Sequence, residues 1–216
     1  MNDNTLKALA RTDDTLTVGN YIIVFGGRDL EGIGSDNKNR DGSLGEYFTK
    51  NTVLDSAYTG AGALYVDWEH GADGVSVDEV LGVVDWKTAR PDERGVFVQR
   101  VLNRRNQYVK WLEELIDAGL VGNSSEAVPS GVEKAADGEI KAWPLRRDTL
   151  TVAPMEPRML TQNALRAAKA LRLLPDEQIE PEPEAPPEAA KAAAGAAKVR
   201  ARVILELLEQ FKEKLT

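Results

Sequence analysis

The 216-residue sequence contains no cysteine and only one histidine, His70. Without cysteine there can be no disulfide, no thiolate zinc site and no cysteine nucleophile, and a single imidazole cannot supply a metal site that needs two. His70 is the residue available for acid–base chemistry near neutral pH, because among unperturbed side chains only imidazole titrates there. The absence of cysteine also fits a reducing compartment such as a cytoplasm.

Long apolar runs and an excess of basic residues are missing too. No stretch approaches the roughly 20 apolar residues that cross a bilayer, and residues 1–4 lack the basic start and apolar core of a signal peptide. The 27 Lys and Arg residues stand against 35 Asp and Glu, a net charge of -8. Phosphate binding requires clustered cations. We therefore expect a soluble protein made in a cytoplasm, with neither a membrane nor a nucleic acid as partner.

Short β-branched and aromatic runs, separated by glycine, aspartate and asparagine, fill much of the first 154 residues and are typical of antiparallel strands and turns. The predicted strands cover residues 21–25, 63–66, 80–84, 96–101, 120–125, 138–145 and 148–154. Apolar residues recur at helical spacing over residues 105–118, before Gly119, and over about residues 162–174, before Pro175. The sequence predicts an α+β body over residues 1–160, closed by a helix over residues 161–174.

The remaining residues change character twice. Residues 175–188 are rich in proline and glutamate and predict a stiff, self-repelling linker. Residues 189–216 begin with an alanine-rich stretch and continue with a helical apolar stripe that includes Val203, Leu207 and Phe211. Because no domain is left to bury this stripe, the C-terminal helix is expected to dock onto the body or onto a partner.

The strongest pairing for chemistry joins His70 with Ser124 and Ser125. His70 follows the apolar run of residues 63–66, at a strand end where side chains are delivered to a site. A serine hydroxyl becomes a good nucleophile when a base within hydrogen-bond reach takes its proton. Serine pairs next to glycine and asparagine are, however, more often simple turn residues.

Further members of such a site stay open at the level of sequence. The carboxylate that would orient the imidazole is Asp67, Asp73, Asp85 or Asp148. Arg146 and Arg147 are candidates to stabilise an oxyanion, although adjacent arginines are more often solvated or paired with acids.

Several segments, taken in order, resemble the prohead (head maturation) serine proteases of tailed phages, which are similar in fold to the herpesvirus assemblins. The match spans about residues 20–158, and the ordered set is more specific than any one piece. The segments are Phe25-Gly26-Gly27-Arg28-Asp29-Leu30, residues 64–73 around Asp67-Trp68-Glu69-His70-Gly71, residues 81–84, residues 120–129 with Asn123-Ser124-Ser125, residues 138–145, and Leu150-Thr151-Val152-Ala153-Pro154.

This resemblance implies a small, mostly antiparallel β-barrel flanked by helices, with His70 as base, Ser124 as nucleophile and Ser125 as the alternative nucleophile. It implies no metal and no cofactor. The substrates would be the scaffold protein and the major capsid protein, and also the protease itself, inside the phage procapsid in the host cytoplasm. A homodimer is compatible with this reading.

The chain departs from the family pattern in two places. Where an acidic residue and then a small one often precede Ser-Leu-Thr, this chain has Arg147, Asp148 and Thr149, so either Asp148 supplies the third catalytic member or the set is a dyad. Glu126 stands where glycine is frequent. These departures motivate a rival hypothesis, an inactive protease-like scaffold or assembly protein that acts through its C-terminal helix. A peptide-binding β-module is a weaker third hypothesis.

Overall fold

The computed structural model describes residues 4–29, 45–55, 63–69 and 80–170. The chain divides into two compact units, residues 1–164 and residues 165–216. All described strands belong to the first unit. His70, Asp73, the linker and the C-terminal helix of the sequence analysis lie outside the described residues.

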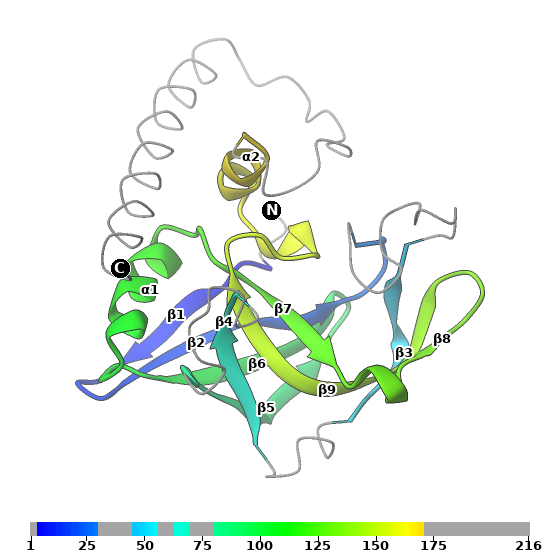
Figure 1. The fold of residues 1–216 in the computed structure, drawn as a ribbon, viewed down its shortest axis with the longest axis horizontal. Helices are drawn as coiled ribbons and strands as arrows, with labels where there is room; N and C mark the ends of the chain where they lie inside the picture. Colours follow the sequence, from blue (N-terminus) through cyan, green and yellow to red (C-terminus); the bar gives the residue numbers. More distant parts are fainter. Residues whose placement is uncertain (1–3, 30–44, 56–62, 70–79, 171–216) are drawn as a thin grey trace. The chain divides into compact units, whose positions relative to one another are not determined.

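The first unit is built on one mixed sheet (Figure 1). Its path runs β1-β2-β6-β5-β4-β9-β3, and β7 and β8 also pair with β9. Most pairs are antiparallel, whereas β3 and β4 run parallel to β9. The strands are β1 (Lys7–Arg11), β2 (Thr15–Val24), β3 (Tyr47–Asp55), β4 (Leu64–Trp68), β5 (Gly82–Pro91), β6 (Gly95–Asn103), β7 (Gly122–Ala127), β8 (Glu133–Lys134) and β9 (Glu139–Thr151).

The predicted α+β class with a strand-dominated core is confirmed, but the predicted barrel is wrong because the sheet does not close. The end of β2 meets β3 only at an isolated bridge between Phe25 and Phe48. Gly26 and Gly27 follow with positive φ angles of 64° and 68°. Glycine adopts this left-handed backbone readily. The contact does not extend into a ladder, because the next backbone hydrogen bond between the two segments runs from Asp29 to Glu46 at 3.1 Å.

Strand β9 is the element that organises the site. The sequence predicts two strands here, and the structure has one of 13 residues. The first half of β9 pairs with β3 and β8 and the second half with β4 and β7, with a register shift opposite Glu126 and Ala127. The expected break between residues 145 and 148 is thus a bulge at which one strand changes neighbours.

The helix predicted over residues 105–118 is confirmed as α1 (Gln107–Asp117). The side chain of Asn106 accepts the backbone N–H of Tyr108 at 2.8 Å, and Gly119, at φ 69°, follows the C-terminal end. Apolar side chains at helical spacing are buried, among them Val109, Leu112 and Ile116.

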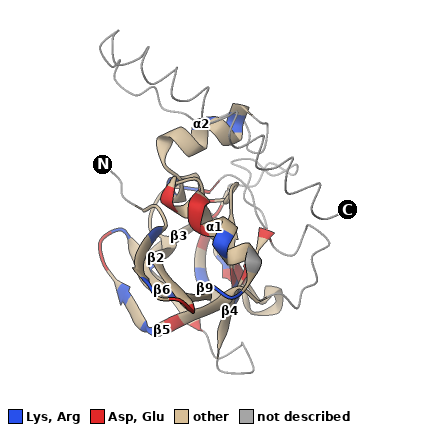
Figure 2. Ribbon diagram, turned by 90° about the vertical axis from the view of Figure 1, so that its left-hand side faces the viewer, with Lys and Arg blue, Asp and Glu red and all other residues tan. Residues whose placement is uncertain are grey.

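Helix α1 is also fixed to the sheet by charge, because Arg11 of β1 pairs with Glu113 at 2.6 Å and with Asp117 at 2.5 Å. The acidic residues of α1, coloured red in Figure 2, outnumber its basic ones. Helix α2 covers Gln162–Ala170, and residues 171–174 of the prediction lie beyond the described part. Neither described helix is long and apolar enough to cross a membrane.

Candidate active site

Strands β7, β9 and β4 place three polar residues in one row. In their register Ser124 of β7 stands opposite Thr149 of β9, and Thr149 stands opposite Asp67 of β4. Cross-strand partners project to the same face of a sheet. The Thr149 hydroxyl donates to Oδ1 of Asp67. Asp67, Thr149 and the half-buried Ser124 therefore form a row, called here the polar row, that joins the first predicted nucleophile to a carboxylate.

Two arginines and a glutamate extend the polar row. Arg147 donates from Nη1 to Oδ2 of Asp67 at 2.8 Å and from Nε to Glu126 at 2.6 Å. Arg146 donates from Nη1 to the other oxygen of Glu126 at 3.1 Å. Both arginines named as oxyanion donors are thus already paired with carboxylates. Their role toward an oxyanion stays a prediction.

Asp148 lies on the opposite face of β9, because side chains alternate along a strand. Its carboxylate accepts from Nε of Arg100, and both side chains have no solvent exposure. Its other oxygen accepts from Asn123 at 3.0 Å. Asn20 completes the network, since it accepts from Arg100 at 2.7 Å and donates to Asn123 at 2.7 Å. Asp148 therefore neutralises a buried guanidinium and belongs to a different face from Ser124.

The two candidate serines also point to different faces. Ser125 pairs in register with Asp148, and its hydroxyl oxygen accepts from the indole N–H of Trp143 at 3.2 Å. Ser124 belongs instead to the polar row. The two hydroxyl groups therefore have different surroundings in the structure. The sequence alone, in which the two serines are adjacent, does not reveal this difference.

Glu69 fixes the point at which the chain leaves β4 toward His70. One carboxylate oxygen accepts the hydroxyl of Thr151 at 2.8 Å, and the other accepts the backbone N–H of Val152 at 2.9 Å. Glu69 has a φ of 47°, an uncommon conformation for a residue other than glycine. Glu69, which precedes His70 in the sequence, is therefore held beside Thr151 and Val152 at the end of β9.

The remaining carboxylates named from sequence are not in this row. Asp85 lies in β5, where it pairs in register with Gln99 of β6 and accepts the backbone N–H of Lys87 at 3.2 Å. Asp73 is outside the described residues. Among the four alternatives, the structure brings Asp67 onto the face of Ser124.

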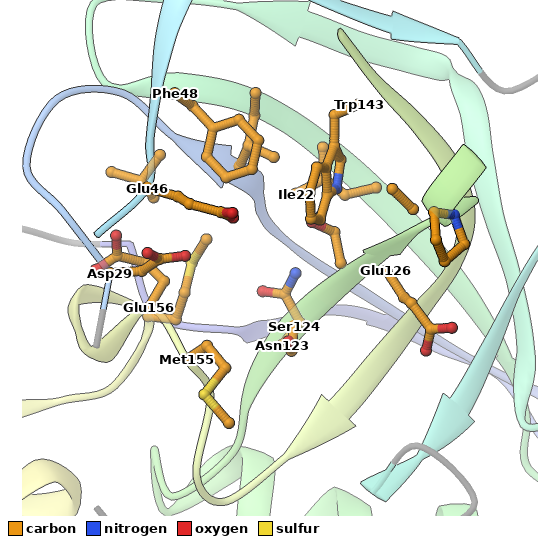
Figure 3. Close-up of a pocket in the computed structure, with 16 residues that line it drawn as sticks. Ile22, Asp29, Glu46, Phe48, Asn123, Ser124, Glu126, Trp143, Met155 and Glu156 are labelled. Atoms are coloured by element: carbon orange, nitrogen blue, oxygen red, sulfur yellow. The ribbon is translucent and has the colours of Figure 1, made fainter. Parts of the chain in front are cut away.

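A pocket of about 350 Å³ lies against β7 (Figure 3). Residues 123–127 of β7 form one wall. The rest of the lining combines apolar side chains with carboxylates: Ile22, Ile23, Val24, Asp29, Glu46, Phe48, Pro129, Trp143, Met155, Glu156 and Met159. Counting Glu126 of β7, four carboxylates line the pocket, and none of the described residues in its lining is a lysine or an arginine.

Asp29, Glu46 and Glu156 gather at one end of this pocket (Figure 3). Oδ1 of Asp29 is buried and has no hydrogen-bond partner among the described residues. Burial, together with the nearby charges of Glu46 and Glu156, raises the pKa of Asp29 to about 8. Burial also raises the pKa of Glu46, against the effect of Lys134 at 3.0 Å. We call these three residues the acidic end of the pocket.

Sequence reasoning did not find the acidic end. Asp29 lies in the Phe25-Gly26-Gly27-Arg28-Asp29 segment, which entered only as a family resemblance. The spacing of residues 29, 46 and 156 does not predict that they lie close together, because they belong to three separate segments of the chain. The sequence signal that could have indicated this site is the pair Gly26-Gly27, which stands shortly before Asp29.

Among the described residues no group of three or more histidines, aspartates or glutamates is arranged to hold a metal ion. Comparisons of the chain with protein-family models, with curated protein sequences and with solved structures gave no match.

Proposed function

We propose that the protein is a serine endopeptidase in which Ser124 is the nucleophile and His70 the general base. The observation that carries the proposal is the polar row, in which Ser124 stands opposite Thr149 and the Thr149 hydroxyl donates to Asp67. Asp67 belongs to β4, the strand that precedes His70 in the sequence. A nucleophile, a base and an orienting acid are the parts that such chemistry needs.

In the proposed mechanism the hydroxyl oxygen of Ser124 attacks the scissile carbonyl while His70 takes its proton. The resulting imidazolium then gives that proton to the leaving amine, and water releases the acyl group from Ser124 by the same route. Asp67 is the preferred orienting acid. Its oxygens already accept from Thr149 and Arg147, but a carboxylate has about four acceptor positions and can take one more donor.

The biological setting comes from the family resemblance. The enzyme would act inside the phage procapsid in the host cytoplasm, on scaffold and major capsid protein and on itself. Fold resemblance alone does not establish activity. The chemistry of the polar row is the part of the proposal that can be tested on the purified protein.

The test compares Ser124→Ala with Ser125→Ala as a matched control. We expect loss of Ser124 to lower cleavage of a co-expressed scaffold protein by at least roughly a thousandfold, the scale seen when a triad nucleophile is removed. Loss of Ser125 should remove only a hydrogen bond to Trp143 and keep most activity. Circular dichroism checks the fold of both variants. A dead Ser125→Ala beside an active Ser124→Ala would exchange the two roles.

The alternative function, an inactive protease-like assembly protein, is favoured by one observation. Arg147 stands where the family often has an acid, and it occupies Asp67 and Glu126 at once. A serine-directed fluorophosphonate separates the two hypotheses, because an active site should label at Ser124 and an inactive one should not label.

A further inference from the structure

The pocket beside β7 suggests which substrates the proposed protease takes. In the described part of the chain β7 pairs only with β9, and its second edge carries no strand there. Five consecutive residues of β7, from 123 to 127, line the pocket. An extended peptide can bind to such an edge through its backbone, while pockets for alternate side chains give specificity. A peptide bound here would run past Ser124 and send alternate side chains to the pocket side.

The size and walls of the pocket fit one long side chain. Its volume of about 350 Å³ lies near the lower end of the range of roughly 300 to 1,000 Å³ for small-molecule sites. Phe48, Trp143, Met155 and Met159 supply apolar walls. An aliphatic stem can pack on such walls while a polar group at its tip reaches further.

The carboxylates at the acidic end favour a side chain that ends in a positively charged group. Two of the three carboxylates at the acidic end already have cations, since Lys134 pairs with Glu46 at 3.0 Å and Arg158 with Glu156 at 2.5 Å. Asp29 has a buried oxygen without a partner in the described part of the chain. A buried acceptor left unpaired is costly, and a charged donor that reaches it forms a strong bond.

We propose that this pocket binds the side chain of a lysine or arginine of the substrate peptide, with Asp29 as the acceptor for its cationic tip and the apolar walls around its stem. The inference rests on the proposed protease function. It predicts cleavage within about two residues of a basic side chain, because alternate residues of an extended peptide face the pocket.

The chain itself contains segments of this kind. Lys191 and Lys198 flank the alanine-rich stretch of residues 192–197. If the protease processes its own tail, the cuts should fall beside these lysines. Mass spectrometry of the incubated full-length chain would report such cuts, with the Ser124→Ala protein as the blank.

The direct test uses two peptides that differ only at one central residue, lysine in one and norleucine in the other. Norleucine keeps the aliphatic stem and lacks the ammonium group. For the full-length protein we expect kcat/KM to be higher for the lysine peptide by roughly tenfold or more, the scale of a hydrogen bond to a charged group. Asp29→Asn should bring the two rates together, and Glu93→Gln, the same acid-to-amide replacement at an exposed site outside the pocket, should not.

The outcomes separate this inference from the proposed function. A protein that labels with fluorophosphonate but cleaves both peptides equally overturns the inference and leaves the protease. The same holds if Asp29→Asn lowers both rates alike, or if calorimetry on Ser124→Ala detects binding of neither peptide. A protein that neither labels nor cleaves refutes the proposed function and this inference together. If Asp29→Asn fails to fold, the ratio of the two rates in the unsubstituted protein still decides.

Discussion

Asp148 forms a buried ion pair with Arg100. Removal of the Asp148 carboxylate should therefore lower the stability of the protein. Asp148→Ala would leave Arg100 buried without its counter-ion, and breaking a buried pair in this way typically destabilises by about 3 to 5 kcal/mol. We expect a loss of that size in the free energy of unfolding measured with urea. The control variant Asp85→Ala removes a carboxylate that accepts the backbone N–H of Lys87. It should lower the free energy of unfolding by about 1 kcal/mol or less.

The same residue tests the catalytic role that the sequence suggested. Asp148→Asn keeps the shape of the side chain and one acceptor oxygen while removing the charge. If Asp148 orients His70, the folded variant should lose turnover far beyond its loss of stability. If it serves only Arg100, activity should follow the folded fraction, and Asp67→Asn should instead lower kcat without unfolding the protein.

Asp29 makes the stability of the body depend on pH. Its pKa in the folded protein, about 8, lies above the ordinary value of 3.8. The folded state therefore binds more protons than the unfolded state between these values, so stability is full below pH 4 on this account and falls as pH rises through 8. We expect Asp29→Asn to gain on the order of 4 kcal/mol over the original protein between pH 5 and pH 8.5, about 1.4 kcal/mol for each pH unit up to the folded pKa.

Thermal melts at the two pH values measure this difference. Glu46 contributes in the same direction, because burial raises its pKa as well, so some pH dependence should persist in the Asp29→Asn variant. Melting temperatures of the variant and the original protein that fall in parallel would show that Asp29 keeps its charge when folded.

At the scale of elements, local patterns were enough to predict α1 and most strands. The apolar spacing of α1, with Asn106 before it and Gly119 after it, carries its own start and stop signals. The sequence predicts two strands, over residues 138–145 and 148–154, where the structure has the single strand β9. The residues between them lie in a bulge, which depends on neighbouring strands that no local window contains.

The site shows the same limit. Side chains alternate along a strand, so Ser124 and Ser125 must differ in their surroundings. Which of the two lies on the face of Asp67 depends on the register of β7 on β9. The ion pair of Arg100 with Asp148 joins strands distant in the sequence, and the acidic end of the pocket joins three separate segments. Long-range pairing of this kind decides the role of a charged residue, and composition or spacing cannot supply it.

At the scale of the whole molecule, the sequence separates the body of residues 1–160 from the tail. The linker of residues 175–188 is acidic and rich in proline, and such a composition resists packing. In the tail of residues 189–216, Val203, Leu207, Phe211 and Leu215 recur every four residues, a spacing that predicts the apolar face of a helix. A stripe on such a tether is suited to recruitment by a scaffold or shell protein.

Deletion of residues 189–216 should therefore leave peptide cleavage unchanged within about twofold while excluding the protein from procapsids, because the polar row and the pocket both lie in residues 22–159. The measurement is copy number per procapsid beside kcat/KM on the lysine peptide. A matched control replaces Leu207 and Phe211 by alanine in the full-length chain, which keeps the length and charge of the tail but weakens its apolar stripe. Normal packaging of both proteins would assign the tail to the stability or dimerisation of the body, and a parallel fall in cleavage would support that assignment directly.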